Sequence, residues 1–297
     1  MLASGDGDGE ETVCYCCLDG DLDDDGQLLR RDCACRGTDA GFVHLSCLTK
    51  YAATKSKQAN GMIEFRKPWR LCPGCHQEYQ NELAVDIASE FFSFVRRQYP
   101  RDTHKQVESL HLKLIALMII FMRLQPVQKR EVGVTANVLI SLIDRMKGDV
   151  SSLPRRYSHF EAEAYNVHGR IALAEGTKES ARRAVVHFEK YLKVNEANGF
   201  AGGVSTAKSN IALAKSIYEG GNNDELLKAS QELYELCIAE DGEEHGDTIH
   251  AGIDYAVNLR KANRGDEASE LLTKLLATSK QVFGSDHNIT KSVESIL

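Results

Sequence analysis

The chain has 297 residues, which is long enough for one large domain or for two smaller ones. A hydrophobic fraction of 42%, only 5 prolines and a mean hydropathy of -0.33 exclude an intrinsically disordered chain and are typical of a folded, soluble protein. The net charge of -7 arises within residues 1–40, which carry 11 acids and 3 arginines. Because no basic patch with interleaved aromatic residues stands out elsewhere, we expect no nucleic acid as a partner.

Residues 1–11 are rich in Gly and Asp and predict a disordered acidic tail. This start has neither a basic cluster nor an apolar stretch, so it predicts no secretory signal. The longest apolar run, residues 114–122, is about half of a membrane span, which indicates a buried helix rather than a transmembrane anchor. We therefore expect an intracellular protein in a reducing compartment, cytoplasm or nucleus, with no membrane as a partner.

Residues 12–80 hold eight of the nine cysteines in short segments that lack a long periodic pattern. In a reducing compartment, clustered cysteines are more often metal ligands than disulfide partners. Two close pairs of ligands can form one tetrahedral zinc site, so four pairs predict two zinc ions. Zinc binding would supply the folding free energy that this small region cannot obtain from its own core. The four pairs are Cys14 and Cys17, Cys33 and Cys35, His44 and Cys47, and Cys72 and Cys75.

The order of these ligands resembles the RING-CH (RING-variant) zinc finger, which has four cysteines, one histidine and three cysteines. The residues that carry the resemblance are C-A-C-R-G-T at 33–38, F-V-H-L-S-C-L at 42–48 and C-P-G-C at 72–75. Eight residues separate Cys35 from His44, where this family usually has seven. The cross-braced topology of the family implies one zinc ion held by Cys14, Cys17, His44 and Cys47, and a second held by Cys33, Cys35, Cys72 and Cys75.

Members of this family are typically ubiquitin ligases, so the resemblance implies a RING-type ubiquitin-protein ligase with no catalytic residue of its own. Such a finger positions a ubiquitin-charged conjugating enzyme so that a substrate lysine can attack the thioester. The resemblance also implies that Cys16, the surplus thiol of the first pair, and Pro73 contact the conjugating enzyme. Two features depart from many RING fingers: no tryptophan follows Cys47, and His76 occupies a position that often carries a cation.

Two other interpretations stay open. A PHD-like reader shares the ligand set, and Trp69 lies near the position of its tryptophan, although the one-residue gap between Cys33 and Cys35 fits RING-CH better. A zinc-dependent interaction adaptor without ligase activity is the second, because Cys16 is equally consistent with a small apolar filler. The acidic run at 21–26 matches a calcium-loop pattern, but without a helix before it the run predicts an acidic surface loop.

Residues 81–297 have the hydrophobic periodicity of helices and almost no strand signals. The motif that begins at Gly242 and ends at His245 recurs from Gly284 to His287, 42 residues later. A period near 40 that contains two helices indicates an α-solenoid. The period and these junctions resemble tetratricopeptide repeats of the kinesin-light-chain type, clearest in residues 203–297, and a plain helical bundle is the alternative.

Small residues support this helical-hairpin interpretation. Ala256 and Ala268 are twelve residues apart across a predicted turn, and Gly169 with Ala181 or Ala184 forms a similar set upstream. Small side chains at this separation let two antiparallel helices approach closely. The sequence thus predicts a small zinc-stabilised RING-CH finger followed by an all-α, tetratricopeptide-like solenoid. We expect the concave face of the solenoid to recruit an unknown protein substrate or a scaffold.

Overall fold

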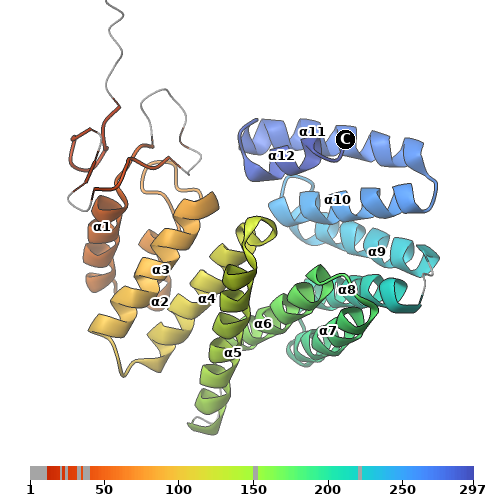
Figure 1. Cartoon of the computed structure of the whole chain (residues 1–297), viewed down its shortest axis with the longest axis horizontal. Helices are drawn as coiled ribbons and strands as arrows, with labels where there is room; N and C mark the ends of the chain where they lie inside the picture. Colours follow the sequence, from red (N-terminus) through yellow and green to blue (C-terminus); the bar gives the residue numbers. More distant parts are fainter. Residues whose placement is uncertain are drawn as a thin grey trace, which may run out of the picture. The chain divides into compact units, whose positions relative to one another are not determined.

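The computed structural model describes residues 12–20, 22, 23, 26–31, 35, 41–149, 153–219 and 223–297. The tail predicted at 1–11 lies outside the described residues. Contacts within the chain divide it into two compact units, Met1–Arg123 and Leu124–Leu297. Figure 1 shows the helices of both units.

Unit 1 combines an irregular finger with a set of helices. Isolated antiparallel bridges join the finger segments, among them Val13 with Gly20 and Arg30 with Val43. The described residues of the finger form no longer strand, as expected for a region with few apolar residues. The helices of unit 1 are α1 (Leu45–Lys57), α2 (Met62–Arg66), η1 (Lys67–Trp69), α3 (Asn81–Gln98), α4 (Thr103–Ile119) and η2 (Phe121–Arg123).

The core of unit 1 is shared by the finger and by α3. Trp69 is buried at 1% exposure, and its ring stacks on Phe91 of α3 with 5.1 Å between centroids. Its indole N–H donates to the hydroxyl of Ser56 in α1 at 2.7 Å, and that hydroxyl donates to the carbonyl oxygen of Phe65 at 2.7 Å. The finger and α3 therefore share one hydrophobic cluster, although the sequence predicts a domain boundary after residue 80.

Unit 2 is an all-α array of helical hairpins, as predicted. Each helix packs against the next one along the chain, the arrangement typical of a tetratricopeptide-like solenoid. Helices α10 and α12 begin at Gly246 and Asn288, so their starts differ by 42 residues, the predicted period. None of the helices among the described residues is long and apolar enough to cross a membrane. The helices of unit 2 are α5 (Pro126–Asp149), α6 (Arg155–Ala174), α7 (Lys178–Asn198), α8 (Ala201–Glu219), α9 (Asn223–Asp241), α10 (Gly246–Lys261), α11 (Gly265–Phe283) and α12 (Asn288–Glu294).

The repeated histidines begin two equivalent helices. His245 is the N-cap of α10, and its Nδ1 accepts the N–H of Asp247 at 3.3 Å. His287 is the N-cap of α12, and its Nδ1 accepts the N–H of Ile289 at 3.2 Å. Each imidazole thus satisfies one of the free N–H groups at a helix start. The two residues are junction residues of the repeat.

The predicted small residues lie where helices of a hairpin meet. Ala256 of α10 and Ala268 of α11 are fully buried. Gly169 of α6 faces the ring of Phe188 of α7 so closely that a Cβ at position 169 would lie 2.3 Å from a ring carbon. The upstream hairpin therefore uses the same close approach as the downstream one, which extends the repeat to α6 and α7.

We predict that Gly169→Ala destabilises unit 2. Replacing a mid-helix glycine by alanine normally stabilises a helix by about 0.5–1 kcal/mol. At position 169 the added methyl group collides with Phe188, and overpacking of this kind costs about 1–3 kcal/mol. The matched control is Gly133→Ala in α5, where the nearest atom would lie at an ordinary 3.7 Å and the change should be neutral or stabilising. Chemical denaturation followed by circular dichroism measures both, and equal effects would contradict the close approach.

Two half-buried histidines stack on each other in unit 2. His168 of α6 and His187 of α7 stack with 5.1 Å between ring centroids and an interplanar angle of 24°. The buried atoms His168 Nε2 and His187 Nδ1 have no hydrogen-bond partner among the described residues. Burial, with smaller contributions from His187 and Lys190, lowers the pKa of His168 to about 4, and burial also lowers the pKa of His187. The fold therefore disfavours protonation of both rings.

We predict that acid weakens unit 2 through this pair. Because the folded pKa of His168 lies below its unfolded value of about 6.5, its contribution is complete above pH 6.5 and is lost as the pH falls toward 4. At pH 5 the loss should reach up to about 2 kcal/mol. The measurement is the free energy of unfolding at pH 7.5 and pH 5 for the wild type and for His168→Gln. The variant should lose less stability between the two pH values, and an equal loss in both proteins would contradict the role of His168.

Candidate metal centre

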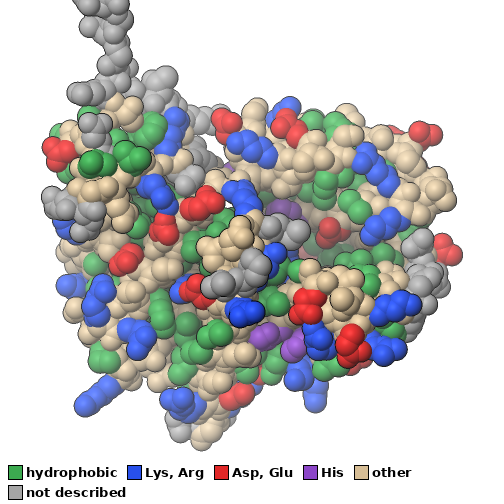
Figure 2. Space-filling view, viewed as in Figure 1, with side chains coloured by type: hydrophobic (Ala, Val, Ile, Leu, Met, Phe, Trp, Pro, Cys, Tyr) green, Lys and Arg blue, Asp and Glu red, His purple; other side chains and the backbone are tan. Residues whose placement is uncertain are grey.

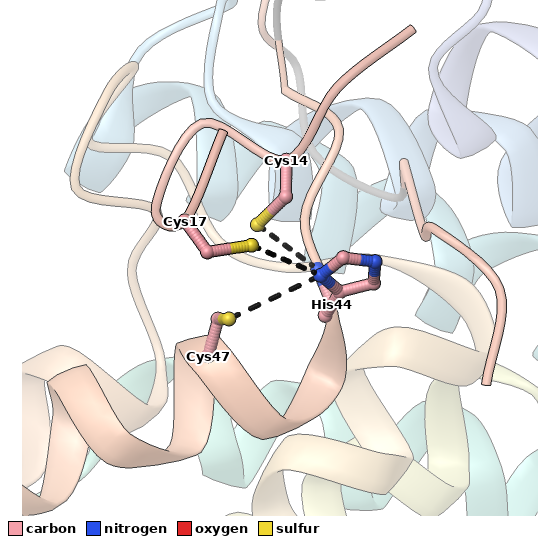
Figure 3. Close-up of side chains that lie close together, drawn as sticks. All are labelled: Cys14, Cys17, His44 and Cys47. Carbon is pink, nitrogen blue, oxygen red and sulfur yellow. Dashed lines mark hydrogen bonds between the residues drawn. The ribbon is translucent and has the colours of Figure 1, made fainter. Parts of the chain in front are cut away.

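The first group of metal-binding side chains lies at the start of α1. His44 is the N-cap of α1 but makes no capping hydrogen bond through its side chain. Cys47 follows three residues later, so the helix places both side chains on one face. The turn that contains Cys14 and Cys17 brings their sulfur atoms to the same point, as Figure 3 shows. All four ligand atoms lie within 4.8 Å of one another.

The geometry of this group fits a zinc ion. Zinc–sulfur bonds of about 2.3 Å and zinc–nitrogen bonds of about 2.0–2.1 Å place neighbouring ligand atoms of a tetrahedron about 3.6–3.8 Å apart. Nδ1 of His44 lies 3.4 Å from the sulfur of Cys17 and 4.0 Å from that of Cys47. Three thiols and one imidazole are also a donor set that zinc prefers.

The electrostatics of the thiols also favour a bound cation. Burial raises the pKa of Cys14, but N–H groups of the backbone, led by that of His44, outweigh it and lower the pKa to about 7. The N–H groups of Cys16 and His44 point at this sulfur from 3.4 and 3.5 Å. Burial and the neighbouring thiols raise the pKa of Cys47 to about 12. The thiols therefore cannot all ionise at neutral pH unless a cation joins them.

A second group contains three further cysteines. The sulfur atoms of Cys35, Cys72 and Cys75 lie within 4.8 Å of one another, and those of Cys35 and Cys72 are 3.6 Å apart. Cys33, the predicted fourth ligand, lies outside the described residues. The turn that holds Cys72 and Cys75 is closed by a bridge between Leu71 and Glu78. This group could hold a metal ion if Cys33 completes it.

The two groups alternate along the chain. The first pair of predicted ligands joins the third pair in one group, and Cys35 of the second pair joins the fourth pair in the other. This alternation agrees with the topology that the resemblance implies. The identity and the number of the ions stay predictions.

The predicted contact residues lie outside both groups. Cys16 is exposed, and Pro73 is partly exposed beside Cys72. Cys16 belongs to neither group of ligand atoms, although its backbone N–H points at the sulfur of Cys14 from 3.4 Å and its side chain also contacts that sulfur. Both side chains are accessible enough to touch a partner.

Two features of the finger were not predicted from the sequence. Arg30, which pairs with Val43 in an antiparallel bridge, forms an ion pair with Asp86 of α3. Asp86 is 56 positions away along the chain, so no local pattern could indicate this contact. Leu18, Leu22 and Leu28 are more than half exposed. Leu22 lies inside the acidic run and Leu18 and Leu28 lie close to it, so the presence of leucines in an acidic surface loop was a signal that the sequence carried.

We predict that the intact chain binds two zinc ions and that unit 1 depends on them. A zinc chelator should shift the fluorescence of Trp69 to longer wavelength, because the indole would leave its buried site, while most of the helical circular dichroism of unit 2 persists. Mass spectrometry under native conditions counts the ions. His44→Ala should lose one ion, whereas His104→Ala, an exposed histidine of α4, should keep both. One ion or none in the wild type would contradict the ligand assignment.

Some solved structures are similar to this chain at low sequence identity. No family model matches the chain, and no curated protein matches it. Among solved structures, BtubC (BKLC) from P. vanneervenii is similar, with 14% sequence identity, a TM-score of 0.49, and coverage of 72% of this chain and 83% of that chain. A kinesin-light-chain-like protein of Podosopora anserina with nearly identical TPR-like repeats is also similar, with 14% identity, a TM-score of 0.40, and coverage of 80% and 95%. The fold of unit 2 is therefore assigned from its own helix packing.

Proposed function

We propose that this protein is a RING-type ubiquitin-protein ligase whose finger binds two zinc ions. The observation that carries the proposal is the grouping of seven predicted ligands into two alternating sets, of four and three. Two metal sites that alternate along the chain would fix the turn at Cys14–Cys17 and the turn at Cys72–Cys75 in one small domain. In the RING-CH family, which residues 14–75 resemble, such turns bind a conjugating enzyme. Zinc would supply structure in this site and no chemical step.

The residues of the finger would act by positioning. Pro73 lies on the closing turn and Cys16 on the first turn, and both are at least partly exposed. A conjugating enzyme held there would present its ubiquitin thioester to a substrate lysine in a productive orientation. The rigid base for these turns is α1 and α3, because Trp69 ties them into one core.

Unit 2 would recruit the protein substrate or a scaffold. Arg170 of α6 interacts with Asp254 of α10, and His250 of α10 interacts with both. All three residues have surface that solvent can reach. Protein atoms around them nevertheless reduce their hydration, which lowers the pKa of Arg170 and of His250 and raises that of Asp254. Exposed groups that still lose hydration are typical of a concave surface, and Figure 2 shows a hollow among the helices of unit 2. A protein segment could make hydrogen bonds with these groups.

A zinc-dependent adaptor without ligase activity is the second candidate. Cys16 is smaller than the aliphatic residue that RING fingers often use, and His76 replaces a cation. Both differences would weaken binding of a ubiquitin-loaded conjugating enzyme. A PHD-like reader is less favoured, because Trp69 is buried in the core of unit 1.

We predict that the zinc-loaded chain forms ubiquitin chains on itself with at least one member of a panel of conjugating enzymes. Pro73→Ala should reduce the rate by about tenfold or more while zinc content stays unchanged, because a contact at the centre of an interface is lost. His44→Ala should abolish activity through loss of a ligand. The matched control is Pro154→Ala, an exposed proline of unit 2, which should retain the wild-type rate.

The adaptor interpretation would replace the ligase if the wild type built no chains with any enzyme of the panel. If Pro73→Ala left the rate unchanged, the conjugating enzyme would have to contact another part of the finger.

A further inference from the structure

Three charged or polar side chains of unit 2 converge without a contact between them. Arg170 lies on α6, and His250 and Asp254 lie on α10. Among the described residues, none of the three forms a hydrogen bond or an ion pair. They are nevertheless close enough to act on one another, because the charge of Arg170 influences the ionisation of both His250 and Asp254. Figure 2 shows histidine and acidic side chains in the hollow among the helices of unit 2.

The helices place these side chains in one row. His250 and Asp254 are four residues apart, so both lie on the same face of α10. Asn166 precedes Arg170 by four residues on α6, and its Oδ1 accepts a hydrogen bond from Nδ2 of Asn210 on α8 at 3.0 Å. Asp254 lies 44 residues after Asn210, the same interval that separates Asn210 from Asn166. These five residues therefore cross α6, α8 and α10 on one side of the solenoid, and we call them the polar row.

The charged members of the polar row have lost hydration without gaining a contact. Burial lowers the pKa of Arg170, and the attraction of Asp254 offsets this effect only in part. Burial also raises the pKa of the Asp254 carboxyl, although Arg170 and His250 attract its charged form. A charged group that has lost water and makes no hydrogen bond is costly. A ligand that supplies the missing contacts is therefore favoured at this row.

The two unpaired charges decide which ligand fits. The guanidinium of Arg170 requires an acceptor, and a carboxylate matches its geometry and charge. The carboxylate of Asp254 requires a donor, and a lysine or arginine side chain supplies one of opposite charge. Nucleic acid would be repelled by Asp254, and a uniformly basic segment would be repelled by Arg170. Because the row crosses three helices, the ligand must also be elongated.

We propose that the polar row binds an extended protein segment with both an acidic and a basic side chain, the acid on Arg170 and the base on Asp254. Asn166 and Asn210 each use one end of the carboxamide for their mutual hydrogen bond. The other ends, Nδ2 of Asn166 and Oδ1 of Asn210, can bond the peptide groups of the segment. This inference rests on the proposed recruiting role of unit 2 and names the class of segment that is recruited.

Binding of short labelled peptides to the zinc-loaded full chain tests the proposal. The probe is a flexible peptide in which glutamate and lysine alternate between glycine and serine residues. The comparison peptides carry only glutamate or only lysine at the charged positions. Fluorescence anisotropy should show the mixed probe binding about tenfold more tightly than either single-sign peptide. Its affinity should fall as salt is raised, because both contacts are between charges.

Single variants separate the two charges. Arg170→Gln should weaken the mixed probe by about tenfold and should strengthen binding of the all-lysine peptide, because the repelling cation is gone. Asp254→Asn should weaken the mixed probe to a similar extent and should strengthen binding of the all-glutamate peptide. The matched controls are Arg183→Gln on α7 and Glu270→Gln on α11, which remove exposed charges outside the row and should leave all three affinities unchanged. Circular dichroism checks that each variant is folded.

Several results would overturn the proposal. These are no binding of the mixed probe, equal or tighter binding of a single-sign peptide, or folded variants that do not change the preference between peptides. Self-association of the chain that Arg170→Gln removes, measured by sedimentation, would assign the row to a second copy of the chain and would also overturn it.

Self-ubiquitination of the wild type, measured on the same preparation, separates this inference from the proposed ligase. Binding of the mixed probe without self-ubiquitination would refute the ligase and keep the polar row. Self-ubiquitination without binding of the probe would refute the polar row and keep the ligase.

Discussion

Three thiols and one imidazole nitrogen within 4.8 Å of one another are the constraint on which the finger depends. Without a cation, burial and mutual repulsion hold the pKa of Cys47 far above neutral, so these side chains have no reason to gather in their protonated forms. With a cation, the same convergence joins a turn near residue 15 to the start of α1. Short irregular segments then acquire a defined shape that their few apolar residues could not produce.

One aromatic residue, Trp69, connects the finger to the helices of unit 1. Trp69 of η1 stacks on Phe91 of α3 and donates to Ser56 of α1, so these three helices share one core. The ion pair between Arg30 and Asp86 adds a second link between the finger and α3. A rigid base of this kind would suit the positioning role that we propose for the finger, because a small displacement of the contact residues would misdirect a bound partner.

Unit 2 follows a different principle, since each of its helices packs mainly on its neighbours in the chain. Its stability is therefore local, and close approaches such as Gly169 against Phe188 set the spacing of each hairpin. The same arrangement brings Arg170 near His250 and Asp254, although 80 residues separate Arg170 from His250. A solenoid thus gathers polar groups from distant helices without burying them in a core.

The sequence by itself determined the features that depend on local spacing. The pairs of metal ligands, the 42-residue repeat, the small residues of the hairpins and the surplus position of Cys16 were all visible as short patterns. Only the tertiary structure decided which pairs of ligands meet, that Trp69 is buried against α3, and that Leu18, Leu22 and Leu28 face outward. The reason is that a turn or a helix fixes the relative positions of residues that are close in the sequence, so a local pattern reveals them. Burial depends instead on which distant segment packs against a side chain, and a single sequence does not identify that segment.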